Sequence, residues 1–162
     1  KKLLFMGGDI AQYDEWNHES SVQWDLLKFP YHQGLQNLVT DLNHLYRSEP
    51  SLYQYDFSQA GFEWINCHDS SQSVLSYIRK SDNESLLVIL NFTPIPRTDY
   101  RIGVHTRGFY EEVLNTDSQI YGGSNMGNIG GVTSDEAPWG DFEHSINIIV
   151  PPLAVVVLKY KQ

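Results

Sequence analysis

The hydrophobic positions between Pro30 and Pro50 recur at intervals of three and four residues, the spacing of one face of an α-helix. Proline suits the first helical turn and does not continue a helix, so these two residues fit the two ends. Arg47 lies in the expected last turn, where the helix dipole favours a cation. The pattern predicts a helix from Tyr31 to Ser48. Its apolar face consists of Leu35, Leu38, Val39, Leu42, Leu45 and Tyr46.

After Pro50 the pattern changes to short runs of β-branched and aromatic residues separated by turn residues, which is typical of β-strands. The runs are Phe62 to Asn66, Val74 to Arg79, Leu86 to Phe92, Tyr100 to Val104, Phe109 to Asn115, Ile146 to Val150 and Ala154 to Tyr160. Many short strands without a second clear helix predict an antiparallel β-sandwich of Greek-key type. We therefore expect a mainly β fold, with a C-terminal all-β domain at residues 51–162.

The first eight residues, Lys1 to Gly8, have the pattern of a buried β-strand that runs into a glycine turn. A continuous apolar strand is typical of a parallel sheet, in which each strand needs neighbours and crossover helices. The order of strand, polar loop and helix is that of a β/α unit. We expect residues 1–50 to belong to a larger domain whose other elements lie outside this sequence.

Charge and composition restrict the classes of partner. Twenty acidic residues against eleven basic ones give a formal net charge of −9 at pH 7. Nucleic-acid binding depends largely on Lys and Arg that neutralise phosphates, so nucleic acid is not an expected partner. The sequence has neither a run of about 18 apolar residues nor a signal-peptide pattern, and we expect no membrane partner. The single cysteine, Cys67, cannot form an internal disulfide, which fits a reducing compartment.

Two further features do not indicate a metal or cofactor site. Cys67 and its neighbour His68 are too few to form a metal-ligand set, and we expect no metal and no cofactor. The glycine-rich stretch from Tyr121 to Gly131 lacks the lysine and the Ser or Thr of a phosphate-binding loop and opens no predicted helix. A long ordered surface loop is favoured there. Asn125 and Asn128 are of a type that hydrogen-bonds sugars, which leaves sugar binding open.

The segment from Asp9 to Asp25 holds the densest group of functional side-chain types in the chain. A glycosidase needs two carboxylates held roughly 5 to 10 Å apart. The acidic residues of this segment after Asp9 are Asp14, Glu15, Glu19 and Asp25. No His or Arg is placed by spacing to tune them, so solvated charges or helix caps are the favoured interpretation.

Sugar binding by this loop is better supported than catalysis. Trp16 and Trp24 lie near Asn17 and His18. Aromatic faces stack on the C–H faces of pyranose rings, while amide and imidazole groups hydrogen-bond the hydroxyls. An alternative role for Trp24 is that of an apolar anchor of the loop. Trp16, which is flanked by polar and charged residues, is the better contact candidate.

Several stretches of the chain carry recognisable motifs. They are Leu3 to Asp9, Glu15 to His18, Leu35 to Asn43, Gly61 to Ile65, Asn91 to Arg97, Val113 to Asp117 and Pro151 to Ala154. Together they resemble the C-terminal part of bacterial glycogen branching enzymes, members of the α-amylase superfamily. The Asn-Phe-Thr-Pro-x-Pro-Arg and Leu-Asn-Thr-Asp motifs are specific to branching enzymes, whereas Leu-Phe-Met-Gly-x-acid is shared across the superfamily. The resemblance spans nearly the whole chain.

The resemblance implies that the first strand is the eighth strand of a (β/α)₈ barrel and that the predicted helix follows it. Residues 1–50 are then the remnant of a catalytic barrel, and the loop after the strand lies on its substrate-facing rim. The implied glucan-binding residues are Asp9, Trp16, Asn17, His18 and Trp24. Branching enzymes usually have glutamate at the position of Asp9 and often an aromatic residue at that of Ile10, which leaves the contacts of Asp9 open.

The resemblance also implies an activity for the parent protein. Branching enzymes cleave an α-1,4-glucan chain, hold it as a covalent glycosyl enzyme and transfer it to a 6-hydroxyl group. Their nucleophile, general acid and transition-state-stabilising aspartate follow earlier barrel strands, so we expect no catalytic residue in this chain and no activity from it alone. The implied partners are α-glucan chains and the N-terminal barrel of the parent. The implied location is the cytoplasm.

Three alternatives remain. The chain is an autonomous glucan-binding module if the β-domain carries an exposed aromatic platform, for which Trp139 and Tyr121 are the candidates. It is a purely structural terminal domain if it binds nothing. It belongs to a debranching or trehalose-releasing relative if the parent catalyses another reaction, an alternative that the branching-enzyme motifs disfavour.

Overall fold

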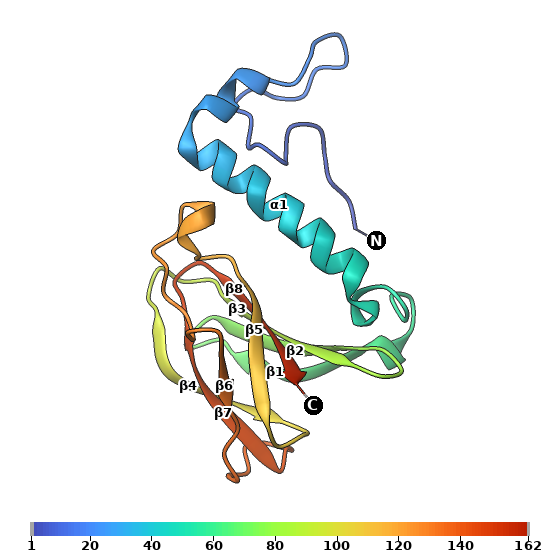
Figure 1. The fold of residues 1–162 in the computed structure, drawn as a ribbon, viewed down its shortest axis with the longest axis vertical. Helices are drawn as coiled ribbons and strands as arrows, with labels where there is room; N and C mark the ends of the chain where they lie inside the picture. Colours follow the sequence, from blue (N-terminus) through green and yellow to red (C-terminus); the bar gives the residue numbers. More distant parts are fainter. Residues whose placement is uncertain (1, 162) are drawn as a thin grey trace.

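The computed structural model describes residues 2–161, which form eight β-strands and one α-helix. The helix, α1 (Pro30–Ser48), lies over one face of a six-stranded sheet, and a two-stranded sheet covers the other face (Figure 1). The strands are β1 (Phe62–Asp69), β2 (Val74–Lys80), β3 (Ser85–Asn91), β4 (Arg97–Val104), β5 (Phe109–Asn115), β6 (Gly131–Thr133), β7 (His144–Val150) and β8 (Val155–Lys161). The larger sheet has the order β1-β2-β3-β8-β5-β6, and the smaller one pairs β4 with β7. All pairings are antiparallel.

The predicted helix and the seven strands predicted after Pro50 are confirmed to within a few residues at their ends. The mainly β, antiparallel fold class is confirmed with them. The sequence pattern missed β6, which contains only Gly131, Val132 and Thr133. Three residues that include a glycine carry too little alternation to be distinguished from a turn.

The central strand β3 shows why the larger sheet needs a layer on each face. Leu87 and Ile89 belong to the core between the two sheets, together with Ile102 and Ile146 of the smaller sheet. Leu86 and Val88 belong to a second cluster, against which Leu38 and Leu45 of α1 pack. Side chains alternate between the two faces of a strand, so a run of consecutive apolar residues buries both faces. The helix therefore covers a face that would otherwise be exposed to water.

A polar contact fixes α1 on the loop after β5. The hydroxyl of Tyr121 donates a hydrogen bond to Asp41 Oδ2 at 2.6 Å. Burial raises the pKa of the Tyr121 hydroxyl, and the bond to the Asp41 carboxylate raises it further. Because Tyr121 packs against the helix-side cluster, it does not form the exposed aromatic platform for which it was a candidate.

The strand expected at the start of the chain is not formed. Lys1 lies outside the described residues, and residues 2–5 are irregular and lead into turns at residues 6–11. Leu3, Leu4 and Phe5 are 89%, 56% and 58% exposed, although their apolar run suggested a buried strand. A parallel strand gains its hydrogen bonds and its burial only from neighbouring strands and helices. None of the described strands lies beside this segment in either sheet.

Among residues 2–161, no helix is long and apolar enough to span a membrane. The described part of the chain also contains no group of three or more His, Cys, Asp or Glu side chains arranged to hold a metal ion. Cys67 is a half-buried free thiol on β1.

Candidate functional site

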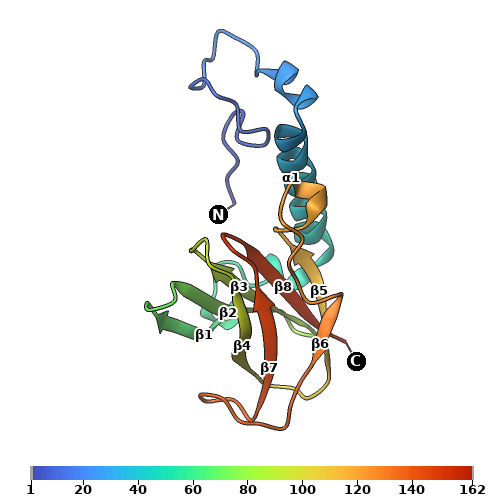
Figure 2. The ribbon, with the colours of Figure 1, turned by 90° about the vertical axis from the view of Figure 1, so that its left-hand side faces the viewer.

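The loop that holds the predicted binding residues lies beyond the N-terminal end of α1, on the far side of the helix from the smaller sheet (Figures 1 and 2). Trp16 and Trp24 are 47% and 52% exposed, and Asn17 and His18 are exposed as well. Asp9 is half-buried within the turn that follows the first residues. The loop therefore offers several side chains to a ligand, but it does not bring all five predicted residues together.

The side chains of the loop that do lie together are grouped around Trp16. Its ring lies 5.7 Å from that of Phe5, edge to face, and 6.1 Å from that of His18. Trp16 also lines a cleft of about 400 Å³, together with Phe5, Asp14 and Glu15. Of the five predicted residues, Trp16 alone lines this cleft within the described part of the chain; the other four are Asp9, Asn17, His18 and Trp24. The cleft thus adds three neighbours of Trp16 that were not predicted as binding residues: Phe5, Asp14 and Glu15.

A glycine turn sets the position of the cleft. The carbonyl of Gly7 accepts hydrogen bonds from the amides of Ile10 and Gln12, at 3.3 and 3.2 Å. Gly7 has a φ of +79°, and a Cβ there would lie 2.3 Å from the side chain of Gln12. A residue with a side chain would be strained by the backbone angle and would also overlap Gln12. The turn therefore requires glycine at position 7.

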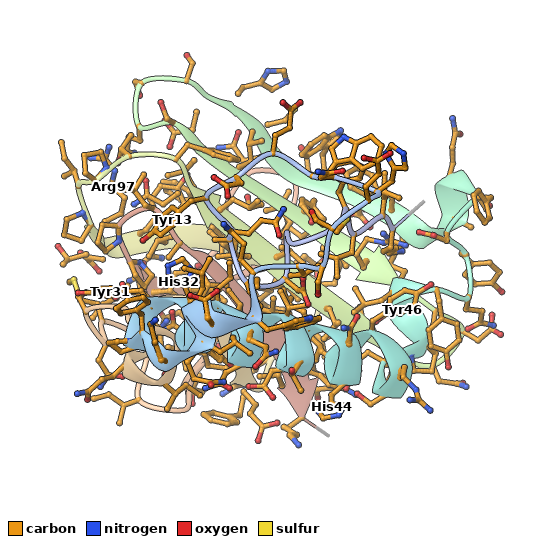
Figure 3. All side chains as sticks on the ribbon, turned by 90° about the horizontal axis from the view of Figure 1, so that it is seen from above. Tyr13, Tyr31, His32, His44, Tyr46 and Arg97 are labelled. Carbon is orange, nitrogen blue, oxygen red and sulfur yellow. The ribbon has the colours of Figure 1, made fainter. Side chains whose placement is uncertain are left out.

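Two residues that the sequence did not single out hold the loop in place. The side-chain oxygen of Gln23 accepts hydrogen bonds from the amides of Tyr13 and Asp14, at 3.1 and 3.4 Å. His32, buried in the first turn of α1, lies with Nδ1 2.6 Å from the carbonyl oxygen of Ile10. A carbonyl only accepts, so Nδ1 donates, and in the neutral ring Nε2 accepts from the Tyr13 hydroxyl at 3.1 Å. Figure 3 shows Tyr13 beside His32 at this end of the helix.

We expect replacement of His32 by phenylalanine to loosen this loop without unfolding the β-domain. Phenylalanine keeps an aromatic ring but removes both hydrogen bonds, which leaves the carbonyl of the fully buried Ile10 unpaired. Such a loss costs about 1–2 kcal/mol, so the amides of Ile10 and Gln12 should exchange with solvent about tenfold faster. Hydrogen exchange measured by NMR tests this.

His44→Phe is the matched control, because His44 is exposed near the opposite end of the same helix (Figure 3). It should leave the exchange of both loop amides unchanged. Equal effects of the two substitutions would show that His32 does not anchor the loop.

Three carboxylates of the loop, Asp14, Glu19 and Asp25, are engaged in surface contacts. Asp14 accepts a hydrogen bond from the amide group of Gln23. Asp25 lies 3.6 Å from Lys28, and Glu19 lies 3.7 Å from His18, in pairs that are largely exposed. These contacts fit the interpretation of solvated or capping charges. What the loop offers chemically is an aromatic face with hydrogen-bonding groups beside it, which suits binding rather than bond cleavage.

A protein-family model described as "Alpha amylase, C-terminal all-beta domain" matches residues 64–161. The chain belongs to the alpha-amylase C-terminal domain family. Membership in this family agrees with the two antiparallel sheets and accounts for β1 to β8. The loop and α1 precede the matched residues.

Comparison with curated proteins extends the relationship to the rest of the chain. The chain is 56% identical over 161 residues to the 1,4-alpha-glucan branching enzyme GlgB of Nitrosococcus oceani, and 57% identical over 158 residues to that of Cellvibrio japonicus. These matches cover 99% and 98% of this chain but 22% and 21% of the relatives, so the chain spans about a fifth of their length. The resemblance to branching enzymes is thereby confirmed.

Among solved structures, the crystal structure of CldA, a cyclomaltodextrin glucanotransferase, matches with a TM-score of 0.55 and 14% identity. The match covers 88% of this chain and 24% of that one. At this level of identity the likeness shows a shared fold alone.

Proposed function

We propose that this chain is the C-terminal part of a 1,4-alpha-glucan branching enzyme, which transfers glucan chains to form α-1,6 branches in glycogen. The observation that carries the proposal is 56% identity to such an enzyme over 99% of the chain. The identity includes the polar loop and α1 as well as the β-domain. A relationship to C-terminal β-domains in general would not produce a match across the first 60 residues, which precede the matched β-domain.

Within the parent, residues 1–50 are proposed to complete a catalytic barrel and residues 51–162 to support it. The exposed apolar run Leu3-Leu4-Phe5 favours this division, because contiguous apolar groups on a surface mark a site of contact with another element. Burial of such side chains stabilises by about 1.5–3 kcal/mol each. The partner implied by the branching-enzyme resemblance is the remainder of the barrel, and the proposed location is the cytoplasm.

The loop is proposed to contact α-glucan at the rim of that barrel. Trp16 supports this role best, since it is half-exposed, lies beside His18 and lines the cleft of about 400 Å³. Asp9, Asn17, His18 and Trp24 are proposed as further contacts of the same rim. A glucose ring that stacks on Trp16 would also meet the hydrogen-bonding groups of Asp14 and Glu15.

The proposal predicts opposite results for the chain and for its parent when each is incubated with amylose. The parent should form α-1,6 linkages, detected by proton NMR of the product and by the loss of iodine staining. The chain of 162 residues should form none, because branching enzymes carry their nucleophile and general acid after earlier barrel strands. A parent that produces no α-1,6 linkage, or a chain that produces them alone, would overturn the proposal.

A further inference from the structure

A second cleft lies in the β-domain, away from the polar loop. It has a volume of about 480 Å³ and runs between the end of β1 and the start of β4. A smaller pocket of about 150 Å³ shares Asn66, Arg101 and Trp139 with it. Pockets for small molecules typically enclose about 300–1,000 Å³, so the cleft has room for a ligand of that class.

Trp139 gives this cleft an exposed aromatic wall. The side chain comes from the loop between β6 and β7, which lies at the lower end of the molecule in Figure 2, and it is 50% exposed. The guanidinium carbon of Arg101 lies 6.0 Å from the centre of the indole ring. An exposed indole beside polar side chains is the arrangement that stacks on the C–H face of a sugar ring.

The loop that carries Trp139 is held rigidly. Trp139 and Phe142 exchange backbone hydrogen bonds of 3.0 and 3.2 Å, and Ser145 Oγ donates to the carbonyl of Ala137 at 2.7 Å. Gly103 of β4 permits this close packing, since a Cβ there would lie 2.6 Å from the carbonyl oxygen of Trp139. A platform fixed before binding loses little conformational entropy when a ligand arrives.

Hydrogen-bonding groups line the same cleft. Arg97 Nε is buried and has no hydrogen-bond partner within the described chain, although Nη2 of the same side chain donates to the carbonyl of Gln72 at 3.1 Å. Asn66 accepts from the amide of His68 through Oδ1, which leaves its NH₂ group as a donor. An acceptor bound in the cleft, directly or through water, would satisfy such donors.

The charges of the lining cancel. Two arginines, Arg97 and Arg101, stand against two aspartates, Asp69 and Asp99. Asp69 accepts hydrogen bonds from Tyr100 at 2.8 Å and from Gln72 at 3.1 Å. Burial alone would raise the pKa of Asp69, but the bonds from Tyr100, Ser71 and Gln72 outweigh it and lower the pKa. An aromatic wall with balanced charges suits a neutral, hydroxyl-rich ligand better than an anion or a cation.

We propose that this cleft binds a segment of α-1,4-linked glucan, with Trp139 as the stacking platform and Asn66 and Arg97 as donors to sugar hydroxyls. The choice of α-glucan among neutral sugars rests on the proposed function. The site provides the β-domain with a contact to glucan that is separate from the loop around Trp16.

The indole N–H signals of the ¹⁵N-labelled chain test the proposal. The chain has four tryptophans, so the signal that disappears in Trp139→Phe identifies Trp139. Maltohexaose should shift the Trp139 indole and the Asn66 side-chain amide with a common dissociation constant. Trp139→Ala should weaken the binding reported by Asn66 at least about tenfold, and Trp139→Tyr should retain it. Cellohexaose, with β-1,4 linkages, should cause no shift.

Phe57→Ala is the control, because Phe57 is an aromatic residue that is 81% exposed and lines neither this cleft nor the cleft around Trp16. It should leave the affinity reported by Asn66 unchanged. The proposal is overturned if maltohexaose shifts only other indoles, if Trp139→Ala binds as the unsubstituted chain does, or if cellohexaose acts equally. Branching by the parent without a shift at Trp139 would overturn this site alone, whereas a shift at Trp139 with an inactive parent would overturn the proposed function alone.

Discussion

Replacement of Lys159 by methionine is expected to destabilise the chain by about 3 kcal/mol, because it removes the charge that two enclosed carboxylates share. Lys159 Nζ lies 2.6 Å from Glu49 Oε2 and 2.7 Å from Glu84 Oε2. The three side chains are only 23%, 12% and 25% exposed. Burial opposes the charge on Lys159, but the hydrogen bonds to Glu49 and Glu84 outweigh it and raise the lysine's pKa.

Lys161→Met provides the matched control for this prediction. Lys161 lies on the same strand and also contacts a carboxylate, Glu111, at 2.7 Å, but the two side chains are 53% and 39% exposed. An exposed pair of this kind contributes about 0–1 kcal/mol. Urea denaturation followed by circular dichroism should therefore separate the variants by about 2 kcal/mol or more in the free energy of unfolding. Equal losses would show that enclosure of the Lys159 charge cluster contributes little.

The contacts of Lys159 matter because they join α1 to the β-domain. Glu49 directly follows the last residue of α1, whereas Lys159 lies on β8 and Glu84 directly precedes β3. The bridge therefore holds the C-terminal end of the helix on the larger sheet. Because the same helix carries His32 at its other end, the position of the polar loop depends on how firmly α1 is docked.

The strands could be predicted from the sequence because their burial follows a simple period. Leu86 to Ile89 are buried on alternate faces of β3, and the chain around them contains turn residues at regular intervals. The helix is equally predictable from the prolines at its two ends and from its apolar face. The first strand was not, since its apolar run specifies a strand only when neighbours supply its hydrogen bonds. Local pattern therefore predicts α1 and every strand whose partners lie among residues 2–161, apart from the short β6, but it does not predict the short 3-10 helices such as Trp24–Lys28.

Two of the motifs that carry the family resemblance contain side chains with a structural role. Asn91 donates through Nδ2 to the carbonyls of Ile95 and Pro151, at 2.9 and 3.0 Å, and so closes the turn after β3. Asp117 accepts from the amides of Ser124 and Met126 and thereby shapes the glycine-rich loop. Such side chains are recognisable in a sequence because few residue types fit a given turn.

The site was less predictable because its contacts join residues far apart in the chain. Asn128 looked suitable for a sugar, yet its amide group bonds Glu112 and both backbone groups of Ile149. No sequence motif singles out His32, yet it anchors the loop through the carbonyl of Ile10. In both cases the side chain's role depends on a partner about 16 to 22 residues away, which no local pattern encodes.

Replacement of Gly34 by alanine is expected to destabilise the chain by about 2 kcal/mol, although alanine favours a helix over glycine by about 1 kcal/mol. Gly34 is buried on α1, and a Cβ there would lie 2.6 Å from the carbonyl oxygen of Tyr121 and 2.7 Å from its carbonyl carbon. The overlap is with backbone atoms, which cannot move aside as a flexible side chain does. The helix must therefore shift away from the loop after β5, and the cost of that shift exceeds the gain in helix propensity.

Asn37→Ala serves as the control, since Asn37 is exposed on the same helix and its replacement should change stability by less than about 0.5 kcal/mol. A second measurement separates loss of docking from general destabilisation. The pKa of Tyr121 is raised by burial and by its bond to Asp41, so a displaced helix should lower the pH at which this hydroxyl ionises. Ultraviolet titration, with Tyr121→Phe to identify the signal, measures that change. An unchanged Tyr121 titration in Gly34→Ala would mean that the helix accommodates the methyl group without leaving the sheet.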